Sequence, residues 1–266
     1  MGLTNVILPL ARSLARSISP SLHRAVSYRR DKARVERVQR KLLARYGTKV
    51  VGGPFAGMNY VGQSFGSALA PKLIGCYEEE LHPFIERALS RRYLLVINIG
   101  AAEGYYAVGF ALRLPGARVW AFDGKPLAQE LCREVAARNG LLDRISVRGS
   151  CDVPALGEVL TERALVVCDC EGDERVLLDP CLLPVLASCD LLVETHDWLV
   201  PGVSKLLKDR FGGTHGIEEV ESRPREPSAY PALHFLRHKE RWFAVQEFRP
   251  SGQRWLFMTA RIGFQP

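Results

Sequence analysis

Two short segments hold acidic and imidazole side chains at spacings that could support proton transfer or metal binding. The ionisable residues lie two positions apart in each segment: Asp169 and Glu171 in the first, Glu194 and His196 in the second. In extended backbone, such a pair shares one side of its strand. Carboxylates held together raise one another's proton affinity, which suits a general base that removes a proton from a substrate hydroxyl or amine. The same side chains could instead hold a hard divalent cation through oxygen ligands and one imidazole.

The elements that must position these residues are two apolar runs, residues 164–168 and 191–193, which predict buried strands. In open α/β sheets, ligands bind outside the carboxyl ends of the strands, where the first polar residues emerge. If the two strands are neighbours, four ionisable side chains converge on one crevice. The sequence therefore predicts a catalytic or substrate-binding group at one sheet edge, in preference to a metal site. In the structural alternative, Glu194 or His196 only caps the following turn and pairs with an arginine.

Residues 94–123 have the pattern of a strand, a glycine turn, a helix, a second strand and an acidic residue. The first apolar run leads into Gly100 and Gly104, and the second ends at Asp123. Glycines let the backbone turn tightly and approach a ligand at the helix start. A carboxylate at the end of the second strand can accept hydrogen bonds from both ribose hydroxyls. This unit predicts a site for an adenosine-containing cofactor, with a plain structural β-α-β turn as the alternative.

The glycine spacing indicates which cofactor the turn fits. Dinucleotide-binding proteins use Gly-x-Gly-x-x-Gly, in which the middle glycine admits a pyrophosphate, whereas this chain has Ala102 there. Ala102 thus argues against a nicotinamide-dependent oxidoreductase, which we keep as an alternative hypothesis. A non-catalytic binding module is a further alternative. The arrangement of Asn98, Gly100 and Gly104, with Asp123 downstream, resembles the first motif of class I S-adenosylmethionine-dependent methyltransferases.

A narrower resemblance covers about residues 94–197. Residues 169–174, DCEGDE, and residues 192–196, LVETH, resemble the Asp-x-Glu-Gly and Glu-x-His elements of FkbM-type methyltransferases. Residues 98–106, NIGAAEGYY, resemble the glycine turn of the same family. Those enzymes are mostly associated with O-methylation of sugars and natural products. The chain departs from their pattern at Asn98, where an acid is expected, in the glycine-rich region before the sheet and in the segment after Asp197, so the substrate does not transfer.

The resemblance implies an α/β, Rossmann-like class I methyltransferase sheet of seven strands, in the order 3-2-1-4-5-7-6, with the last strand antiparallel and helices on both faces. It also implies S-adenosylmethionine as the cofactor, and a sugar, glycan, lipid-linked or natural-product hydroxyl as the acceptor. The residues expected to contact the cofactor are Asn98, Gly100, Ala101, Glu103, Gly104, Tyr105, Tyr106, Asp123, Gly124, Ser150, Cys151 and Asp169. The residues expected to act in catalysis are Asp169, Glu171, Glu194 and His196, with Asp169 or His196 as the base.

The chain divides into three predicted parts: a basic helical arm over residues 1–46, a glycine-rich region over 47–75, and a methyltransferase domain over 76–266. The glycine-rich region suits either a lid facing the substrate or an irregular packed connector. Expected helices cover residues 6–18, 30–46, 78–90, 127–139 and 203–211. Expected strands cover residues 94–97, 119–122, 145–147, 164–168, 191–193 and 217–221, followed by a hairpin of residues 242–248 and 255–260.

The positive charge is concentrated in the arm. Residues 1–46 contain 11 Lys and Arg residues against Asp31 and Glu36, while the whole chain has a formal net charge of +7. A membrane-surface arm attracted to anionic lipid is one interpretation, and a solvated or dimer-forming extension is the alternative. Nucleic-acid binding is not favoured, because the arm has only Tyr28 and Tyr46 as aromatic residues and no recognised motif.

The remaining sequence features concern the compartment. The uncharged residues 6–11 are too short to span a bilayer, and no secretory cleavage site follows them. The seven cysteines include no Cys-x-x-Cys pair, and several lie in apolar runs, which is typical of reduced thiols. We therefore expect a cytoplasmic protein, with association at the inner membrane surface if the arm binds lipid.

Overall fold

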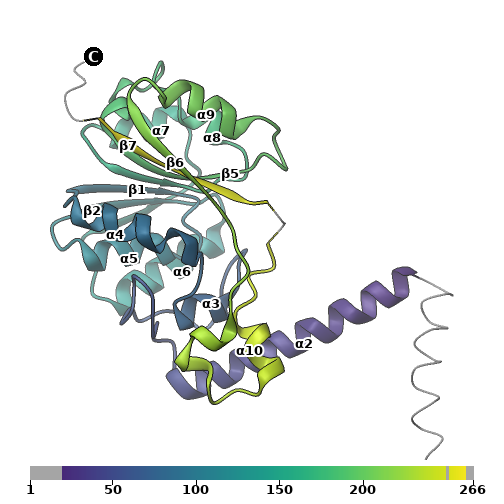
Figure 1. The fold of residues 1–266 in the computed structure, drawn as a ribbon. Helices are drawn as coiled ribbons and strands as arrows, with labels where there is room; N and C mark the ends of the chain where they lie inside the picture. The colour runs from purple at the N-terminus through teal and green to yellow at the C-terminus, as the bar shows by residue number, and fades with distance from the viewer. Residues whose placement is uncertain (1–19, 250–251, 262–266) are drawn as a thin grey trace, which may run out of the picture.

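The structure is a computed structural model that describes residues 20–249 and 252–261, with side chains from residue 31 onward. The predicted helix over residues 6–18 lies outside the described residues. A seven-stranded sheet forms the centre of the molecule, in the order β3-β2-β1-β4-β5-β7-β6 (Figure 1). The strands are β1 (Leu95–Ile99), β2 (Arg118–Phe122), β3 (Ile145–Arg148), β4 (Leu165–Cys168), β5 (Asp190–Thr195), β6 (His215–Glu221) and β7 (Arg254–Ala260).

The strand directions confirm the predicted fold class. Strands β3, β2, β1, β4 and β5 pair in parallel, whereas β7 runs antiparallel to both β5 and β6. The order reverses between β1 and β4, which pair from Val96 opposite Leu165 to Ile99 opposite Cys168. Because parallel neighbours need helical crossovers, helices separate the first five strands along the chain. This is the Rossmann-like arrangement of class I methyltransferases.

Helices cover both faces of the sheet because the strand residues alternate between two apolar cores. Val96 of β1 packs in one core, whereas Leu95, Ile97 and Ile99 pack in the other. The first core lies against α4 (His82–Ser90), α5 (Tyr105–Arg113) and α6 (Pro126–Arg138). The second lies against α7 (Val153–Val159), α8 (Glu174–Leu177) and α9 (Val203–Phe211) (Figure 1). Short 3-10 turns cover Glu79–Leu81, Pro184–Ser188, Pro227–Ala229 and Pro231–Leu233.

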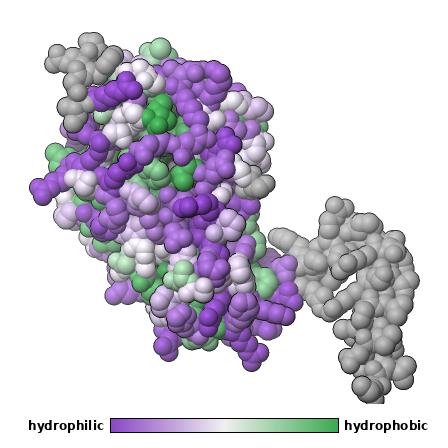
Figure 2. Space-filling model, viewed as in Figure 1, coloured by the Kyte–Doolittle hydropathy of each residue, from purple (hydrophilic) through white to green (hydrophobic). Residues whose placement is uncertain are grey.

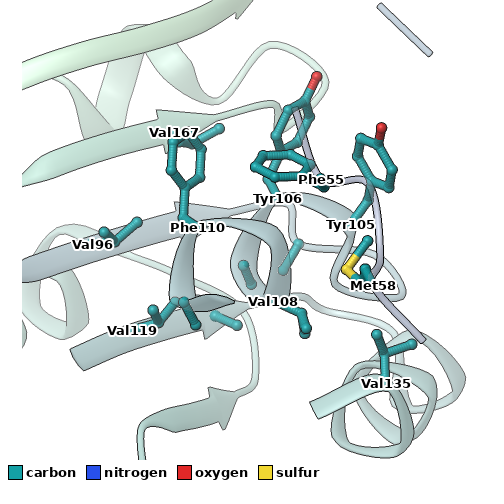
Figure 3. Packing of buried hydrophobic residues seen from close by; sticks show 14 of the residues in the cluster. Phe55, Met58, Val96, Tyr105, Tyr106, Val108, Phe110, Val119, Val135 and Val167 are labelled. Carbon is teal, nitrogen blue, oxygen red and sulfur yellow. The ribbon is translucent and has the colours of Figure 1, made fainter. Parts of the chain in front are cut away.

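The glycine-rich region packs against the first core. Phe55 and Met58 lie against α5, where the Phe55 ring meets the edge of the Tyr105 ring with 5.3 Å between centroids (Figure 3). Gly109 makes this contact possible, because a Cβ atom there would come within 2.5 Å of the Phe55 ring. Most of this region is thus a packed connector, and a short helix, α3 (Leu69–Ile74), ends it.

A third, smaller core joins the N-terminal helix to the segment between β6 and β7. Helix α2 (Pro20–Tyr46) packs Val38 and Leu42 against α3 and against α10 (His238–Ala244). We call α2, α3 and residues 222–249 and 252–253 the cap. The first turns of α2 extend away from the rest of the molecule (Figure 1). Within the described residues, no helix combines the length and the apolar composition that crossing a bilayer requires.

The predicted C-terminal hairpin is wrong. Trp242 and Phe243 belong to helix α10, at whose start the Glu240 carboxylate accepts a hydrogen bond from the Arg237 amide over 3.1 Å. The strand that pairs with β7 on the side away from β5 is β6, not residues 242–248. The sequence predicted β6 as a separate strand. Ala244 and Val245 of this segment pack in the third core, beside Val38 and Leu42 of α2, and not on a sheet.

All seven cysteines are free thiols.

Candidate active site

A cavity of about 580 Å³ opens at the carboxyl ends of β1, β2, β4 and β5, where the strand order reverses. Its lining includes most of the side chains that the sequence singled out. The predicted residues that line it are Gly100, Ala101, Tyr105, Tyr106, Asp123, Gly124, Ser150, Cys151, Asp169, Glu171, Glu194 and His196. The three that do not are Asn98, Glu103 and Gly104.

The glycine turn after β1 is fixed to both neighbouring strands. The Gly100 and Ala101 amides donate to the Phe122 carbonyl oxygen, each over 2.9 Å. Gly100 has a φ of +75°, and a Cβ atom there would lie 1.6 Å from the Asp169 carbonyl oxygen. Only glycine fits this position, because a side chain would collide with the backbone that follows β4. The glycine turn therefore packs closely against the backbone at Asp169, and both line the cavity.

Asp123 is oriented by the backbone. Its Oδ2 accepts a hydrogen bond from the Ala102 amide and its Oδ1 accepts one from the Lys125 amide, each over 2.8 Å. Each carboxylate oxygen keeps a second lone pair for a ligand hydroxyl. The half-buried side chain also lines the cavity. This geometry fits the ribose-binding role that the sequence predicted, and Ala102 is part of the reason, since its left-handed φ of +45° aims the amide at Asp123.

Three predicted cofactor contacts have other roles. Asn98 is buried within β1, where its Nδ2 lies 3.5 Å from the Val167 carbonyl oxygen. Gly104 precedes α5 as its N-cap residue. Glu103 is completely buried and pairs with Lys72, with 2.7 Å between Oε1 and Nζ. The left-handed residues Gly100 and Ala102 precede Glu103 and turn its side chain away from the cavity, a reversal that residue spacing does not reveal.

The Lys72–Glu103 pair fastens the glycine-rich region to the cavity. Glu103 also accepts hydrogen bonds from the Ser64 hydroxyl and from the Phe65 amide, the latter over 3.2 Å. Burial raises the pKa of Glu103, but the Lys72 ammonium and these hydrogen bonds outweigh burial and hold it below its usual value. Phe65 and Ser67 line the cavity beside Lys72. Part of the glycine-rich region thus faces the site. The sequence feature that could have indicated this is Lys72, a charged residue within the apolar sequence of α3.

Three of the four predicted catalytic side chains converge. Asp169, Glu194 and His196 each offer a ligating atom, and these atoms lie within 4.8 Å of one another. His196 Nε2 is 3.4 Å from Asp169 Oδ1. Glu171 instead lies exposed at the cavity rim with a φ of +55°. The predicted pairing of Glu171 with Asp169 on one strand side is wrong, because β4 ends at Cys168 and extended alternation stops there.

Glu174, which the sequence did not single out, orients the histidine. Its Oε1 lies 2.8 Å from His196 Nδ1, and both side chains are buried. Burial lowers the pKa of His196, but the hydrogen bond to Glu174 and the charges of Glu174 and Asp169 outweigh it and raise that pKa. Each ring nitrogen therefore faces a carboxylate, an arrangement that favours the imidazolium form.

We expect Glu174→Gln to lower the pKa of His196, because burial then acts against a weaker hydrogen bond and less negative charge. The pKa can be followed by NMR titration of the isotope-labelled imidazole, assigned by comparison with His196→Gln. Asp173→Asn is the matched control, since Asp173 is an exposed neighbouring carboxylate on the cavity edge. An unchanged His196 pKa in Glu174→Gln, or an equal decrease in both variants, would contradict the assigned role.

Arg249 is the second residue that the sequence missed. It reaches the site from the segment between α10 and β7, and its Nη1 donates to Glu194 Oε1 over 3.0 Å. The same guanidinium contacts Glu78 and Glu247, and it donates to the Tyr77 hydroxyl over 2.7 Å. Burial raises the pKa of Glu194 well above its usual value, and the charges of Asp169 and Glu78 raise it further. No local signal marks Arg249 as a site residue, because the partners that bring it to the site, Glu194, Tyr77 and Glu78, are distant in sequence.

Backbone strain gathers at the cavity. Within residues 20–249 and 252–261, five residues other than glycine adopt a positive φ. Ala102, Glu171 and Phe248 line the cavity, and Glu78 binds Arg249 beside it. Such conformations cost of order 1–3 kcal/mol each and persist where the surroundings over-determine them. Residues with strained backbone conformations cluster at functional sites, so their concentration around this cavity supports its assignment as the site.

The comparisons with known proteins are distant. The sequence matches no protein-family profile and no curated protein. Among solved structures, an O-methyltransferase from Bacillus cereus in complex with SAH is similar at 10% identity and a TM-score of 0.48, over 85% of this chain and 90% of that chain. A putative O-methyltransferase from Klebsiella pneumoniae matches at 14% identity and a TM-score of 0.47, over 89% and 97%.

A third similar structure is the O-methyltransferase TomG from Streptomyces achromogenes, at 12% identity and a TM-score of 0.46, over 66% of this chain and 77% of that chain. The order and directions of the strands carry the fold assignment: this chain has the seven-stranded, Rossmann-like sheet of class I methyltransferases, with a cavity at its switch point.

Proposed function

We propose that the chain is an S-adenosylmethionine-dependent methyltransferase that methylates a hydroxyl oxygen. The observation that carries this proposal is that one cavity holds both an oriented acidic residue beside the glycine turn and a cluster of ionisable groups at the next two strand ends. The first feature suits an adenosyl group, and the second suits removal of a proton from an acceptor. The FkbM-type resemblance of the same motifs supports a sugar, glycan, lipid-linked or natural-product hydroxyl as that acceptor.

The residues around the turn fit the cofactor. Asp123 would accept hydrogen bonds from the ribose hydroxyls, and the Gly100–Ala102 backbone would face the methionine moiety. Ser150 and Cys151, which line the cavity after β3, would lie on the adenine side. The bound cofactor supplies a methyl group on a positively charged sulfur. The protein then has to position the acceptor and remove its proton.

Asp169 is the best candidate for the general base. A third of its side chain is accessible within the cavity, whereas Glu194 and His196 are almost fully buried. Burial raises the pKa of Asp169, and although His196 opposes this, the pKa remains above its usual value. That shift moves the carboxylate toward the proton affinity that suits a base near neutral pH. His196, held between two carboxylates, has its Nε2 3.4 Å from Asp169 Oδ1, where its positive charge would help to orient that carboxylate.

The same cluster bears on the metal alternative. Two carboxylates and an imidazole form a ligand set that a divalent cation could use. Arg249, however, already places a guanidinium on Glu194, and Glu174 holds the other ring nitrogen of His196. The guanidinium, together with the imidazolium form of His196 that Glu174 favours, offsets the negative charge of Asp169 and Glu194 without a metal ion. Both ring nitrogens of an imidazolium carry protons and cannot bind a metal, so we favour proton transfer by Asp169.

We expect Asp123→Ala to weaken S-adenosylmethionine binding at least about 10- to 100-fold in isothermal titration calorimetry, because the loss of even one hydrogen bond to a charged group costs about 1.5–3 kcal/mol. Asp143→Ala is the matched control, since it removes an exposed aspartate that does not line the cavity. Unchanged affinity in Asp123→Ala would remove that carboxylate from the ribose. Tighter binding of reduced nicotinamide nucleotide than of S-adenosylmethionine would favour the oxidoreductase hypothesis.

A further inference from the structure

We propose that the cap docks onto membranes that contain anionic phospholipid, through a surface formed by α2 and α10. We call this the α2–α10 surface and define it by Arg34, Arg37, Arg45, Phe235, Arg237, His238, Lys239, Trp242 and Phe243. The proposal does not depend on the proposed methyl transfer, because it concerns a face of the molecule whose residues do not line the site cavity.

A groove of about 390 Å³ between the two helices gathers positive charge. Arg34 and Arg37 line it from α2, and Arg237, His238 and Lys239 line it from the start of α10. Arg34 also lies over the Phe243 ring, with 5.6 Å between its guanidinium carbon and the ring centroid. A concentration of cations from two separate segments provides the charge complementarity that an anionic headgroup surface requires.

The acid in the groove does not cancel this charge. Glu240 is the one acidic residue among the described residues that line the groove. Its Oε1 already accepts a hydrogen bond from Lys41 over 2.7 Å, and its Oε2 accepts one from the Arg237 amide over 3.1 Å. Glu240 therefore joins the two helices. The two acids of α2 do not line the groove: Asp31 pairs with Arg34 at 3.0 Å, and Glu36 is exposed.

Exposed aromatic side chains accompany the cations. Trp242 is 39% exposed and Phe235 is 43% exposed. Trp242 follows Lys239 by three residues and His238 by four, so these side chains share one face of α10. Phe235 lies beneath Arg45, with 5.8 Å between the guanidinium carbon and the ring centroid. Aromatic rings beside lysine and arginine suit the boundary between headgroups and acyl chains.

The packing of α2 determines how this surface would meet a bilayer. Val38 and Leu42 are buried in the cap core, so the apolar side of the helix is already occupied. The side left to solvent is cationic, and in Figure 2 the corresponding lower end is mostly hydrophilic, with hydrophobic residues scattered among it. Headgroup contact by the cations, with shallow insertion of Trp242 and Phe235, follows from this arrangement. Exposed tryptophan and phenylalanine favour a bilayer over nucleic acid as the anionic partner.

The α2–α10 surface is directly connected to the wall of the site cavity. Helix α10 ends at Ala244, and Phe248 and Arg249, which follow shortly after, line the cavity. On the other side, α3 packs against α2 and supplies Lys72 to the same cavity. Docking through this surface would therefore place the membrane against elements that are linked to residues of the cavity lining.

The test is flotation of the full-length protein with vesicles of phosphatidylcholine alone, or of phosphatidylcholine with about one third phosphatidylglycerol. We expect binding only to the anionic vesicles, and weaker binding as salt increases. Arg37→Glu combined with Lys239→Glu should weaken it by at least about 25-fold, since each lost cation near an anionic surface contributes about fivefold and the two new carboxylates add repulsion. Trp242→Phe should remove most of the fluorescence quenching caused by brominated lipid.

The matched control is Arg118→Glu combined with Lys205→Glu, which makes the same change in net charge at exposed positions outside the α2–α10 surface. Thermal melting of both double variants checks that they fold. Equal binding to the two vesicle types, no binding to either, or equal losses in the two double variants would overturn the proposal. Binding to a DNA duplex without binding to anionic vesicles would overturn it in favour of a nucleic-acid partner.

Discussion

Asp169→Asn is expected to lower kcat by about 100- to 10,000-fold, the range that a positioned general base contributes. The amide has nearly the shape of the carboxylate, so the contact with His196 Nε2, at 3.4 Å in the wild type, can be kept while proton acceptance is lost. Formation of S-adenosylhomocysteine with panels of sugars, phenols and lipid-linked alcohols measures the rate. Calorimetry checks that the variant still binds the cofactor.

The pH dependence separates this role from a structural one. A base must be deprotonated to act, so the wild-type rate should rise as pH increases through the pKa of Asp169, which burial has raised above its usual value. Asp169→Asn should lose that rise. Glu171→Gln is the matched control, because Glu171 is a carboxylate on the exposed rim of the same cavity. A collapse of the rate in Glu171→Gln, with a near-normal rate in Asp169→Asn, would transfer the role to Glu171.

Lys72→Met is expected to lower the free energy of unfolding by about 3–5 kcal/mol, because it leaves a carboxylate buried without its counter-ion. Glu103 is completely buried and Lys72 is 3% exposed, so water cannot compensate for the missing ammonium. Lys72 Nζ also lies 4.7 Å from the centroid of the Tyr77 ring, a contact that the variant loses. Urea unfolding followed by circular dichroism measures the change.

Two further variants test the reason for this loss. Lys72→Met combined with Glu103→Gln should recover most of the stability, since no buried charge then remains. Lys41→Met is the matched control, because it breaks the Lys41–Glu240 pair, whose side chains are 42% and 18% exposed, and should cost less than about 1 kcal/mol. If the double variant is no more stable than Lys72→Met, the pair does not act through its charge.

The sequence determined the sheet and much of the cavity lining because those features depend on local patterns. Apolar runs predicted β1 to β5 to within a few residues, and the first polar residue after each run, such as Asp123 or Asp169, marked a strand end. Since the carboxyl ends of parallel strands meet at one edge, a correct strand order also places these residues together. That is why Asp123, Asp169, Glu194 and His196 all line one cavity.

Tertiary structure alone decided which side chains those residues meet. Glu174, Arg249 and Lys72 reach the site from a helix start, from the segment after α10 and from α3, and residue spacing contains no record of such contacts. Left-handed turns at Gly100, Ala102 and Glu171 also reverse the direction of the following side chains. These turns exclude Glu103 from the cavity and leave Glu171 on its rim, because extended alternation holds only while the backbone stays extended.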